Sequence, residues 1–338
     1  MSVKVLVTGG AGYIGSHMVR LLLQRGYDVV VYDNLSRGNA DAVIGAPLEV
    51  GDLHDRATLD AVFSKYKPVA VMHFAALAYV GESVDEPGMY YHNNVSGTQA
   101  LLDCMRAHGV NKLVFSSTCA TYGVPESLPI TEETPQRPIN PYGHSKLMVE
   151  QILKDYAVAF GLRSIALRYF NAAGCAEDGS LGERHDPETH LLPLILFEAM
   201  RVQAGGDPAD TQLKVFGKDF PTRDGTCIRD YIHVNDLCAA HIQALTRMID
   251  LPDEGAEQYN LGVNQGFTVL EVIEACRKVT GVNIGFQSVD RRAGDPPELV
   301  ADASRAMTYL QWSPTFPDVT MSIQHAWNWF TQNPPTKN

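Results

Sequence analysis

Short, continuously apolar runs alternate with longer amphipathic stretches along the first half of the chain. We interpret the apolar runs as strands, at Val3–Thr8, Val29–Tyr32, Leu48–Val50, Val69–His73, Leu113–Ser117 and Ile165–Leu167. We interpret the amphipathic stretches as helices, at Ile14–Arg25, Arg56–Tyr66, Tyr90–His108 and His144–Phe160. Apolar runs bounded by helices are typical of parallel strands that helices cover on both faces. The pattern therefore predicts an α/β fold built on a doubly wound parallel sheet.

The regular alternation fades after residue 173, where Gly, Pro and acidic residues become frequent. We expect a main domain over 1–173 and a smaller C-terminal α/β lobe over 174–338. Two later stretches, Asp230–Val234 and Gln258–Leu261, have the composition of strands. They predict that segments near 228–265 return to the main sheet.

Composition narrows the classes of function. The 338 residues are 45% hydrophobic and 20% charged, with a formal net charge of −12. This negative charge argues against binding of nucleic acid or of an anionic membrane surface, because phosphates would be repelled. The sequence has no apolar run of membrane-spanning length and no signal-peptide pattern, so we expect a cytoplasmic protein. Six scattered cysteines without a Cys-x-x-Cys pair predict reduced thiols, no disulfide framework and no metal site.

A glycine-rich turn follows the first expected strand and opens the first expected helix. Gly9, Gly12 and Gly15 have the spacing Gly-x-x-Gly-x-x-Gly. Glycine suits a tight turn that must approach a pyrophosphate, and the helix N-terminus offers free N–H groups to the phosphates. A strand–helix turn without a ligand is the simpler alternative, but Asp33 at the end of the second strand favours dinucleotide binding in a Rossmann domain. Its carboxylate would accept bonds from ribose hydroxyls and repel a 2′-phosphate, which favours NAD over NADP.

Two charged residues near this turn have two interpretations each. Arg37 is either a solvated loop cation or a group that accommodates a 2′-phosphate. Asp52, after the third strand, either meets the adenine edge or caps a helix. The sequence leaves both alternatives open.

Tyr142 and Lys146 form a Tyr-x-x-x-Lys pair on one face of an expected helix. An unperturbed phenol has a pKa of about 10, and a nearby ammonium favours the phenolate, which can act as a base. Tyr142 could then take a proton from a hydroxyl while hydride leaves the same carbon. A surface pair is the alternative interpretation, but Thr118 ends an upstream strand and can hydrogen-bond beside the reacting oxygen. Pro141 suits the first turn of a helix.

Further motifs place the chain in a known group. It resembles the extended short-chain dehydrogenases/reductases, and most closely the UDP-glucose (UDP-galactose) 4-epimerases, over nearly its whole length. Besides the glycine turn, Thr118, Tyr142 and Lys146, the resemblance depends on His73–Ala76, Val80–Val84, Asn93–Val95, Leu167–Asn171, Asp224–Thr226, Arg229–Val234 and Arg292–Asp295.

The resemblance implies a mechanism and a set of binding residues. Tyr142, assisted by Thr118, would deprotonate a sugar 4-hydroxyl while hydride passes to NAD; the 4-keto sugar would turn over and be reduced on its other face. NAD would contact Gly9, Gly12, Tyr13, Ile14, Gly15, Asp33, Asn34, Asp52, Leu53, Phe74, Ala75, Asn93, Thr118, Tyr142, Lys146 and Phe170. The UDP-sugar would contact Asn171, Leu191, Phe216, Arg229, Arg292, Asp295 and Leu299. The 1–173 segment would be the NAD-binding domain and 174–338 the nucleotide-sugar-binding lobe.

Three positions depart from the pattern of this group. Ala78 stands where many members carry Lys, and His190 stands where Asn is usual. Leu299 replaces a Tyr of many bacterial relatives, which would leave room for a C2 N-acetyl group. UDP-N-acetylhexosamine and UDP-pentose therefore stay open as alternative substrates.

Related enzymes with the same fold are the main rivals. Nucleotide-sugar dehydratases typically carry Asp-Glu directly after the Ser or Thr that matches Thr118, whereas Cys119 and Ala120 follow here. The decarboxylases usually carry a Glu in this stretch. A non-catalytic NAD-binding sensor commonly loses the Tyr or Lys, and a simple reductase would consume cofactor. The resemblance also implies a homodimer formed by the Tyr90–His108 and His144–Phe160 helices.

Overall fold

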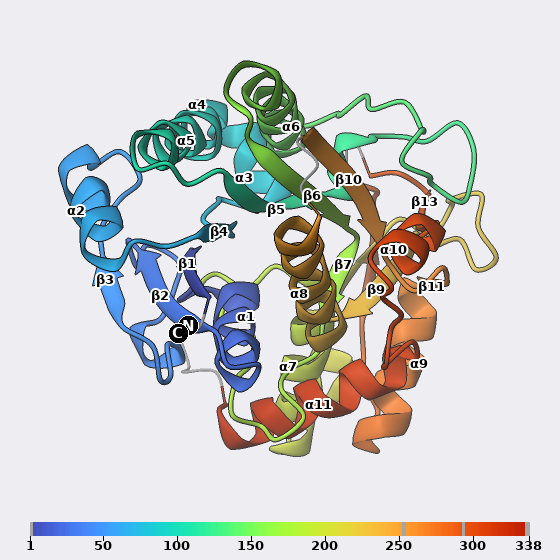
Figure 1. Ribbon diagram of the computed structural model, residues 1–338. Helices are drawn as coiled ribbons and strands as arrows, with labels where there is room; N and C mark the ends of the chain where they lie inside the picture. The colour runs from blue at the N-terminus through green and yellow to red at the C-terminus, as the bar shows by residue number, and fades with distance from the viewer. Residues whose placement is uncertain (1–2, 252–254, 293–294, 335–338) are drawn as a thin grey trace.

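A seven-stranded parallel sheet forms the centre of the molecule (Figure 1). The computed structural model describes residues 3–251, 255–292 and 295–334. The strands of this sheet are β1 (Lys4–Thr8), β2 (Asp28–Asp33), β3 (Leu48–Val50), β4 (Ala70–His73), β5 (Lys112–Thr118), β6 (Arg163–Tyr169) and β10 (Gly255–Leu261). Their order is β3-β2-β1-β4-β5-β6-β10, and every pairing is parallel. The predicted doubly wound α/β fold is confirmed.

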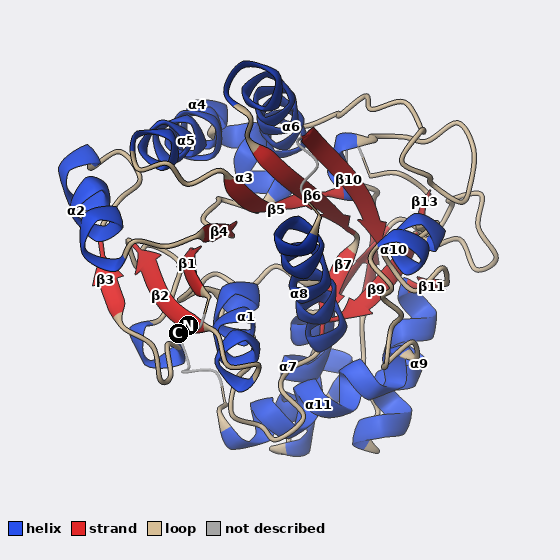
Figure 2. Cartoon of the chain, viewed as in Figure 1, coloured by secondary structure: helices blue, strands red, loops and turns tan. Residues whose placement is uncertain are grey.

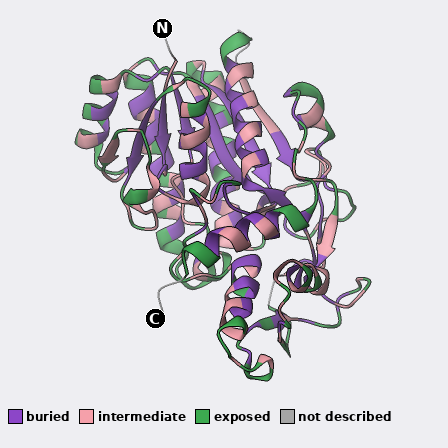
Figure 3. Cartoon of the chain, turned by 90° about the horizontal axis from the view of Figure 1, so that it is seen from below, coloured by how far each residue is buried: buried purple, intermediate pink, exposed green. Residues whose placement is uncertain are grey.

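Helices cover both faces of this sheet (Figure 2). One face carries α1 (Tyr13–Gln24) and α8 (Val234–Asp250), and the other carries α2 (Arg56–Tyr66), α5 (Gly97–Ala107) and α6 (Pro141–Phe160). Alternate residues of β1 serve the two cores, because successive side chains of a strand point to opposite faces. Val5 and Val7 pack with α1 and α8, whereas Leu6 packs with α2, α5 and α6. Figure 3 shows the resulting burial of the strands.

The catalytic-helix candidate α6 begins three residues before the predicted start at His144. The Asn140 side chain accepts a hydrogen bond from the backbone N–H of Gly143 (2.8 Å), which caps the helix. Pro141 occupies the first turn, where its missing N–H costs nothing. Tyr142 therefore lies in the first helical turn, one turn before Lys146.

The predicted helix over Tyr90–His108 is divided. It consists of α4 (Pro87–Tyr90), a π-helical segment (Tyr91–Ser96) and α5, and it follows the short α3 (Val80–Asp85). Asn94 lies in the π-helical segment, and its side chain bonds both backbone groups of Leu77 (2.8 and 3.0 Å). Single π turns are frequently found at functional sites.

A second, smaller sheet lies beyond β6. Its centre is β9 (Ile228–His233), which pairs with β7 (Asn171–Ala173), β11 (Gly266–Thr268) and β13 (Glu298–Leu299). A separate pair joins β8 (Lys214–Phe216) to β12 (Gln287–Val289). Helices α7 (Leu191–Gln203), α9 (Val269–Thr280) and α11 (Val319–Gln332) share one apolar core, and the short α10 (Ser304–Tyr309) packs near β10.

The two late strands predicted to return to the main sheet behave differently. Gln258–Leu261 lies in β10, which pairs with β6 in the main sheet. The strand predicted at Asp230–Val234 exists as β9, but its partners are in the second sheet, so the prediction that it joins the main sheet was wrong. Strand composition indicates burial on both faces but carries no information about the partner strand. No helix in the described ranges is long and apolar enough to cross a membrane.

Several buried histidines are held neutral, which predicts loss of stability in acid. Burial lowers the pKa of His241 to about 4, and its Nδ1 bonds the Leu237 carbonyl (2.9 Å). Burial also lowers the pKa of His17 to about 4 and that of His73 to about 3. Because these folded-state pKa values lie below the unfolded value of about 6.5, the unfolded state binds more protons as pH falls from about 6.5 to 4.

We expect His241→Met to flatten this acid dependence. In denaturant titrations the free energy of unfolding should decrease from pH 6.5 to 4.5 in the unmodified protein. Its slope should be shallower in His241→Met by up to about 1.4 kcal/mol per pH unit. His144→Gln, at a half-buried position, serves as the control and should keep the original slope. Equal slopes for all three proteins would contradict the assignment.

Candidate active site

A cavity opens at the carboxyl ends of β1, β2, β3 and β4. Among its lining residues are nine of the predicted cofactor contacts, namely Gly9, Gly12, Asp33, Asn34, Asp52, Leu53, Phe74, Ala75 and Asn93. The carboxyl edge of a doubly wound sheet is where ligands of this fold class bind. The structure therefore brings together residues that lie up to 84 positions apart in the chain, from Gly9 to Asn93.

The glycine turn has the shape expected of a phosphate cradle. Gly9 has a φ of +73°, and a Cβ on Gly9 would collide with the backbone of Ala75. A Cβ on Gly15 would collide with the carbonyl of Gly9. Gly12 differs, because the nearest atom to its Cβ would be the Gly9 carbonyl at 3.4 Å, an acceptable approach. Gly12 lines the cavity, so a side chain there would occupy ligand space, and the residues present fit a dinucleotide pyrophosphate.

Asp33 and Arg37 both line this cavity. Asp33 accepts hydrogen bonds from the backbone N–H groups of Ala11 (2.9 Å) and Leu35 (2.8 Å), which fixes the carboxylate at the end of β2. Arg37 forms an ion pair with Glu82 (2.5 Å) and its guanidinium lies 5.0 Å from the ring centroid of Tyr79. Arg37 is therefore already neutralised by a carboxylate, which weakens it as a receptor for a 2′-phosphate.

Asp52 is not a helix cap. Its two carboxylate oxygens bond the Asn34 side chain (2.8 Å) and the backbone N–H of His54 (2.9 Å). The N-terminus of α2 is capped by Asp55, whose side chain accepts from the backbone N–H of Thr58. Of the two interpretations of Asp52, the position at the cofactor cavity is the one that agrees with the structure.

Four other predicted cofactor residues are not among those that line this cavity. Tyr13, Ile14 and Gly15 form the first turn of α1, and the Tyr13 hydroxyl donates to the carbonyl of Gly174 (2.5 Å). Phe170 lies in a buried apolar cluster with Cys119, Tyr122, Ile130, Leu299 and Ala301. Phe170 therefore lies beside Leu299, a predicted substrate contact.

Thr118, Tyr142 and Lys146 converge where β5 meets α6. Thr118 is the last residue of β5, and its side chain lies close to the Tyr142 hydroxyl. The Lys146 ammonium donates to the carbonyl of Ser116 (2.8 Å) and lies 6.0 Å from the Tyr142 ring centroid. Burial raises the pKa of Tyr142 to about 12, and the nearby Thr118 hydroxyl acts in the opposite direction. Burial lowers the pKa of Lys146 to about 7, while the Glu150 carboxylate acts to raise it.

Glu150, which the sequence analysis missed, supports Lys146 from one turn further along α6. It forms an ion pair with Arg168 of β6 (2.6 Å), and both side chains are nearly inaccessible, at 1% and 2% exposure. Glu150 also accepts from the Ser117 hydroxyl (2.5 Å), and Arg168 donates to the Tyr122 hydroxyl (2.8 Å). The signal available in the sequence was the continuation of the helical spacing from Tyr142 through Lys146 to Glu150.

Asn94 is a second residue whose role the sequence did not reveal. Its amide donates to the Ser145 hydroxyl (3.0 Å), and that hydroxyl donates to the Tyr142 carbonyl (2.7 Å). The π-helical segment therefore holds the first turn of α6 in place.

Five of the predicted substrate residues form one group on the second lobe. Asp295 lies between two guanidiniums, 3.6 Å from Arg229 and 3.6 Å from Arg292. Arg292 lies over the ring of Phe216, 4.3 Å from its centroid. Leu299 of β13 pairs in register with Arg229 of β9. Two permanently charged, fork-shaped guanidiniums suit a diphosphate.

The remaining predicted substrate residues come from neighbouring elements. Asn171 of β7 pairs with Tyr231 of β9, so it lies one strand away from Arg229. Leu191 is the first residue of α7, and His190 precedes it as the N-cap position. His190 lies against Glu183 (3.0 Å) and Glu188 (2.9 Å). Ala78 is exposed.

Together, the doubly wound sheet, the glycine turn and the Tyr–Lys pair with its Thr partner define a dinucleotide-dependent enzyme of the extended short-chain dehydrogenase/reductase class. Comparison with known proteins gives the family. Residues 5–262 match the model of the "NAD dependent epimerase/dehydratase family". The chain belongs to this family.

Similarity to individual proteins extends over the whole chain. The UDP-glucose 4-epimerase of Rhizobium meliloti is 48% identical over 97% of this chain and 97% of its own length. The crystal structure of the Brucella ovis UDP-glucose 4-epimerase in complex with NAD is 48% identical, with a TM-score of 0.91 over 97% of this chain and 98% of that one. The Bifidobacterium longum UDP-glucose 4-epimerase, solved with NAD+ and UDP, is 40% identical, with a TM-score of 0.90 over 98% and 99%.

The buried Glu150–Arg168 pair predicts a large cost for removing one partner. Glu150→Gln leaves the Arg168 charge buried without its counter-ion, so the free energy of unfolding should fall by about 3–5 kcal/mol. Glu126→Gln removes one partner of the exposed pair with Arg137 and should cost less than about 1 kcal/mol. Denaturant titration at neutral pH measures both. If the two variants lost similar free energies of unfolding, the buried Glu150–Arg168 pair would be no more important for stability than an exposed pair.

Proposed function

We propose that this chain catalyses the reversible, NAD-dependent epimerisation of a UDP-sugar at C4, interconverting UDP-glucose and UDP-galactose through a transient 4-keto intermediate. The observation that carries the proposal is the placement of Tyr142 and Lys146 one turn apart on α6, with Thr118 next to Tyr142. Helix α6 is bonded through Ser145 to Asn94, whose neighbour Asn93 lines the cofactor cavity. Full-length similarity to UDP-glucose 4-epimerases supports the choice of reaction.

Tyr142 is the acid and base. It takes the proton of the sugar 4-hydroxyl and later returns it to the opposite face of C4. With a pKa of about 12 in its buried position, Tyr142 needs positive charge nearby to ionise at neutral pH. Lys146 supplies part of that charge, and the Thr118 hydroxyl stabilises the phenolate and orients the 4-hydroxyl.

Bound NAD would supply a reversible acceptor for the hydride from C4. The glycine turn would hold the pyrophosphate, and Asp33 would accept hydrogen bonds from the adenosine ribose hydroxyls. Asn34, Asp52, Leu53, Phe74, Ala75 and Asn93 would surround the nucleoside halves, and Tyr13, Ile14 and Phe170 the rest of the site. Because cofactor is regenerated in each turnover, retention of NAD is favoured over exchange.

Arg229 and Arg292 hold the UDP diphosphate, and Asp295 keeps the two guanidiniums apart and oriented. Phe216 provides an apolar face beneath Arg292. With the diphosphate fixed by these residues, the 4-keto sugar can swing about its linkage and present either face to the same hydride donor. Asn171 and Leu191 would line the space in which it turns.

A second substrate class has a specific observation in its favour. Leu299 lies in the wall formed with Phe170, Cys119 and Tyr122. A leucine is shorter than the tyrosine of many bacterial relatives, so the wall leaves room for a C2 N-acetyl group. UDP-N-acetylhexosamine is therefore the second substrate to test, and a UDP-pentose the third.

Dehydration is disfavoured by the residues after Thr118. Cys119 and Ala120 begin the short turn that follows β5, and Cys119 is buried among apolar neighbours. Removal of water from C5 and C6 needs an acid and a base at that position, and neither a thiol with a pKa raised by burial to about 12 nor a methyl group supplies them.

The decisive assay supplies UDP-galactose to purified protein without added NAD. We expect UDP-glucose to appear, as followed by chromatography, with no net NADH at 340 nm. Tyr142→Phe should reduce kcat by about 10²–10⁴-fold, because the proton then has no acceptor, while NAD content and thermal stability stay unchanged. If the protein converted no UDP-hexose, UDP-N-acetylhexosamine or UDP-pentose, the proposal would be wrong. A 4-keto-6-deoxy product would favour the dehydratase.

We further propose a cytoplasmic homodimer formed by α5 and α6. All six cysteines are free thiols, as suits a reducing compartment. The two helices pack together, with the Tyr156 hydroxyl donating to Asp103 (2.9 Å). The outer side of α6 exposes Met148 and Val158, and Val158 is 91% exposed. Apolar side chains at one face of a helix are suited to an isologous dimer interface.

The dimer proposal predicts that a charge on α6 separates the subunits. Val158→Glu should give a monomer in size-exclusion chromatography with light scattering. Dimerisation would bury the new carboxylate in the interface without a partner, at a cost in desolvation. Val124→Glu changes another exposed valine, which lies in a loop and is 54% exposed, and should leave the dimer intact. A monomeric unmodified protein, or a dimeric Val158→Glu variant, would refute this interface.

A further inference from the structure

The loop between β7 and α7 gathers four groups that the proposed reaction does not use. Glu183, His185, Glu188 and His190 each direct one nitrogen or oxygen atom to a common centre, and these four atoms all lie within 4.8 Å of one another. They occupy alternate or nearby positions within eight residues, in the pattern Glu-x-His-x-x-Glu-x-His. The expectation of no metal site rested on the spacing of the cysteines alone, and this cluster contains none.

The distances within this cluster match those around a tetrahedral metal ion. Glu183 Oε1 lies 3.0 Å from Nδ1 of His185 and 3.0 Å from Nδ1 of His190. Glu188 lies 2.9 Å from His190 Nδ1 and 3.5 Å from His185 Nδ1. Tetrahedral Zn²⁺ binds N and O ligands at about 2.0–2.1 Å, so its ligand atoms are about 3.3–3.4 Å apart.

Hydrogen bonding within the cluster is incomplete. Glu183 and Glu188 are 5% and 6% exposed, so both carboxylates are removed from water. In the described part of the chain, Glu188 Oε2 and His185 Nδ1 are buried without a hydrogen-bond partner, although Nδ1 lies 3.5 Å from Glu188 Oε2 and 3.0 Å from Glu183 Oε1. Leaving a buried polar atom unpaired is costly. Histidine–glutamate ion pairs would balance the charges but would leave these two atoms unsatisfied, whereas a cation between them would satisfy both.

We propose that Glu183, His185, Glu188 and His190 bind one Zn²⁺ ion in a closed, structural site. Two imidazoles exclude Mg²⁺ and Ca²⁺, which prefer all-oxygen ligands, and suit Zn²⁺. Four protein ligands leave no open position for a substrate or a water, so the ion holds structure and takes no part in the chemistry at C4.

The place of the cluster indicates what the ion would hold. The His185 ring lies 6.0 Å from the Tyr13 ring and 5.9 Å from the Tyr79 ring, both measured between centroids. Tyr13 directly follows the glycine turn, and Tyr79 lies beneath the Arg37 guanidinium at the rim of the cofactor cavity. Zn²⁺ would thus fasten the β7–α7 loop against the cofactor-binding edge of the main sheet.

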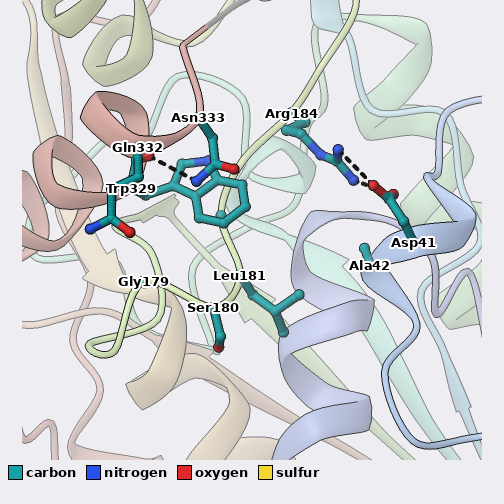
Figure 4. A pocket seen from close by; sticks show the side chains of 10 residues that line it. Asp41, Ala42, Gly179, Ser180, Leu181, Arg184, Trp329, Gln332 and Asn333 are labelled. Carbon is teal, nitrogen blue, oxygen red and sulfur yellow. Dashed lines mark hydrogen bonds and ion pairs between the residues drawn. The ribbon is translucent and has the colours of Figure 1, made fainter.

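The neighbouring part of the same loop borders a cavity and is therefore less tightly packed. A bound ion would stabilise this part of the loop. Residues Gly179 to Gly182 and Arg184 border a cavity of about 370 Å³ together with Asp41 and Trp329. Figure 4 shows Arg184 pointing toward Asp41, with which it forms an ion pair, on the side of this cavity opposite Trp329. Exposed pairs of this kind contribute little stability, so the metal cluster would add to the anchorage that the buried Cys175, Ala176 and Leu181 give the loop.

The test measures zinc directly, without substrate. Chelator-treated protein is titrated with Zn²⁺ and separately with Co²⁺. We expect one ion per chain, visible d–d absorption typical of tetrahedral Co²⁺, and a rise in Tm with Zn²⁺ that Mg²⁺ does not produce. Glu183→Gln and His190→Gln should each weaken Zn²⁺ binding by at least about tenfold and abolish the Tm rise. His190, the more exposed ligand, keeps the test valid if Glu183→Gln does not fold.

His108→Gln is the matched control. His108 lies with Asp60 (2.8 Å) and Cys104 in the other described group with three ligand types close together, and its replacement should leave Zn²⁺ binding unchanged. Substoichiometric zinc, an unchanged Tm rise in Glu183→Gln and His190→Gln, or loss of binding in His108→Gln would each overturn the proposal. None of these results depends on epimerase activity, so the two proposals fail separately.

Discussion

The buried ion pair between Glu150 of α6 and Arg168 of β6 is the contact on which the geometry of the active site depends. It fixes α6 against the sheet in the region where Lys146, one turn earlier, donates to the Ser116 carbonyl of β5. With α6 held at these two points, Tyr142 lies at the end of β5, close to Thr118. Both charges are removed from water, so each needs the other. The same carboxylate acts to keep Lys146 protonated although burial favours the neutral amine.

At the cofactor-binding end of the site, close backbone packing determines the geometry of the glycine turn. Gly9 and Gly15 must lack side chains because the backbone of the turn and the backbone after β4 are already in contact. Gly12 is free of that constraint and faces the cavity. The turn therefore needs glycine for two different reasons. At Gly9 and Gly15 a side chain would collide with neighbouring backbone, and at Gly12 it would occupy the space of the ligand. Asp33, tied to the backbone of the same turn, sets the polarity of the far end of that space.

The two ends of the substrate are handled by different parts of the fold. The reacting hydroxyl meets residues of β5 and α6 on the main sheet, whereas the diphosphate meets Arg229 and Arg292 on the second lobe. Apolar residues from both parts, Phe170 and Leu299 among them, meet in one buried cluster. This division suits a reaction in which one end of the substrate stays bound while the other turns over. The β7–α7 loop, with its Glu–His cluster, spans the boundary between the two parts.

The sequence alone determined the sheet, the glycine turn and the catalytic helix, because each depends on local periodicity or on side chains within one or two turns. Tyr142 and Lys146 lie on the same face of their helix whatever the surrounding tertiary structure, because they are four residues apart. Tertiary structure decided the rest. The β9 strand looks like main-sheet material, yet its partners are β7, β11 and β13, since composition encodes burial and not pairing. Glu150 and Arg168 meet only across the α6–sheet interface, and the two orphan atoms of the Glu–His cluster appear only when the loop is folded, because burial creates the need for a partner.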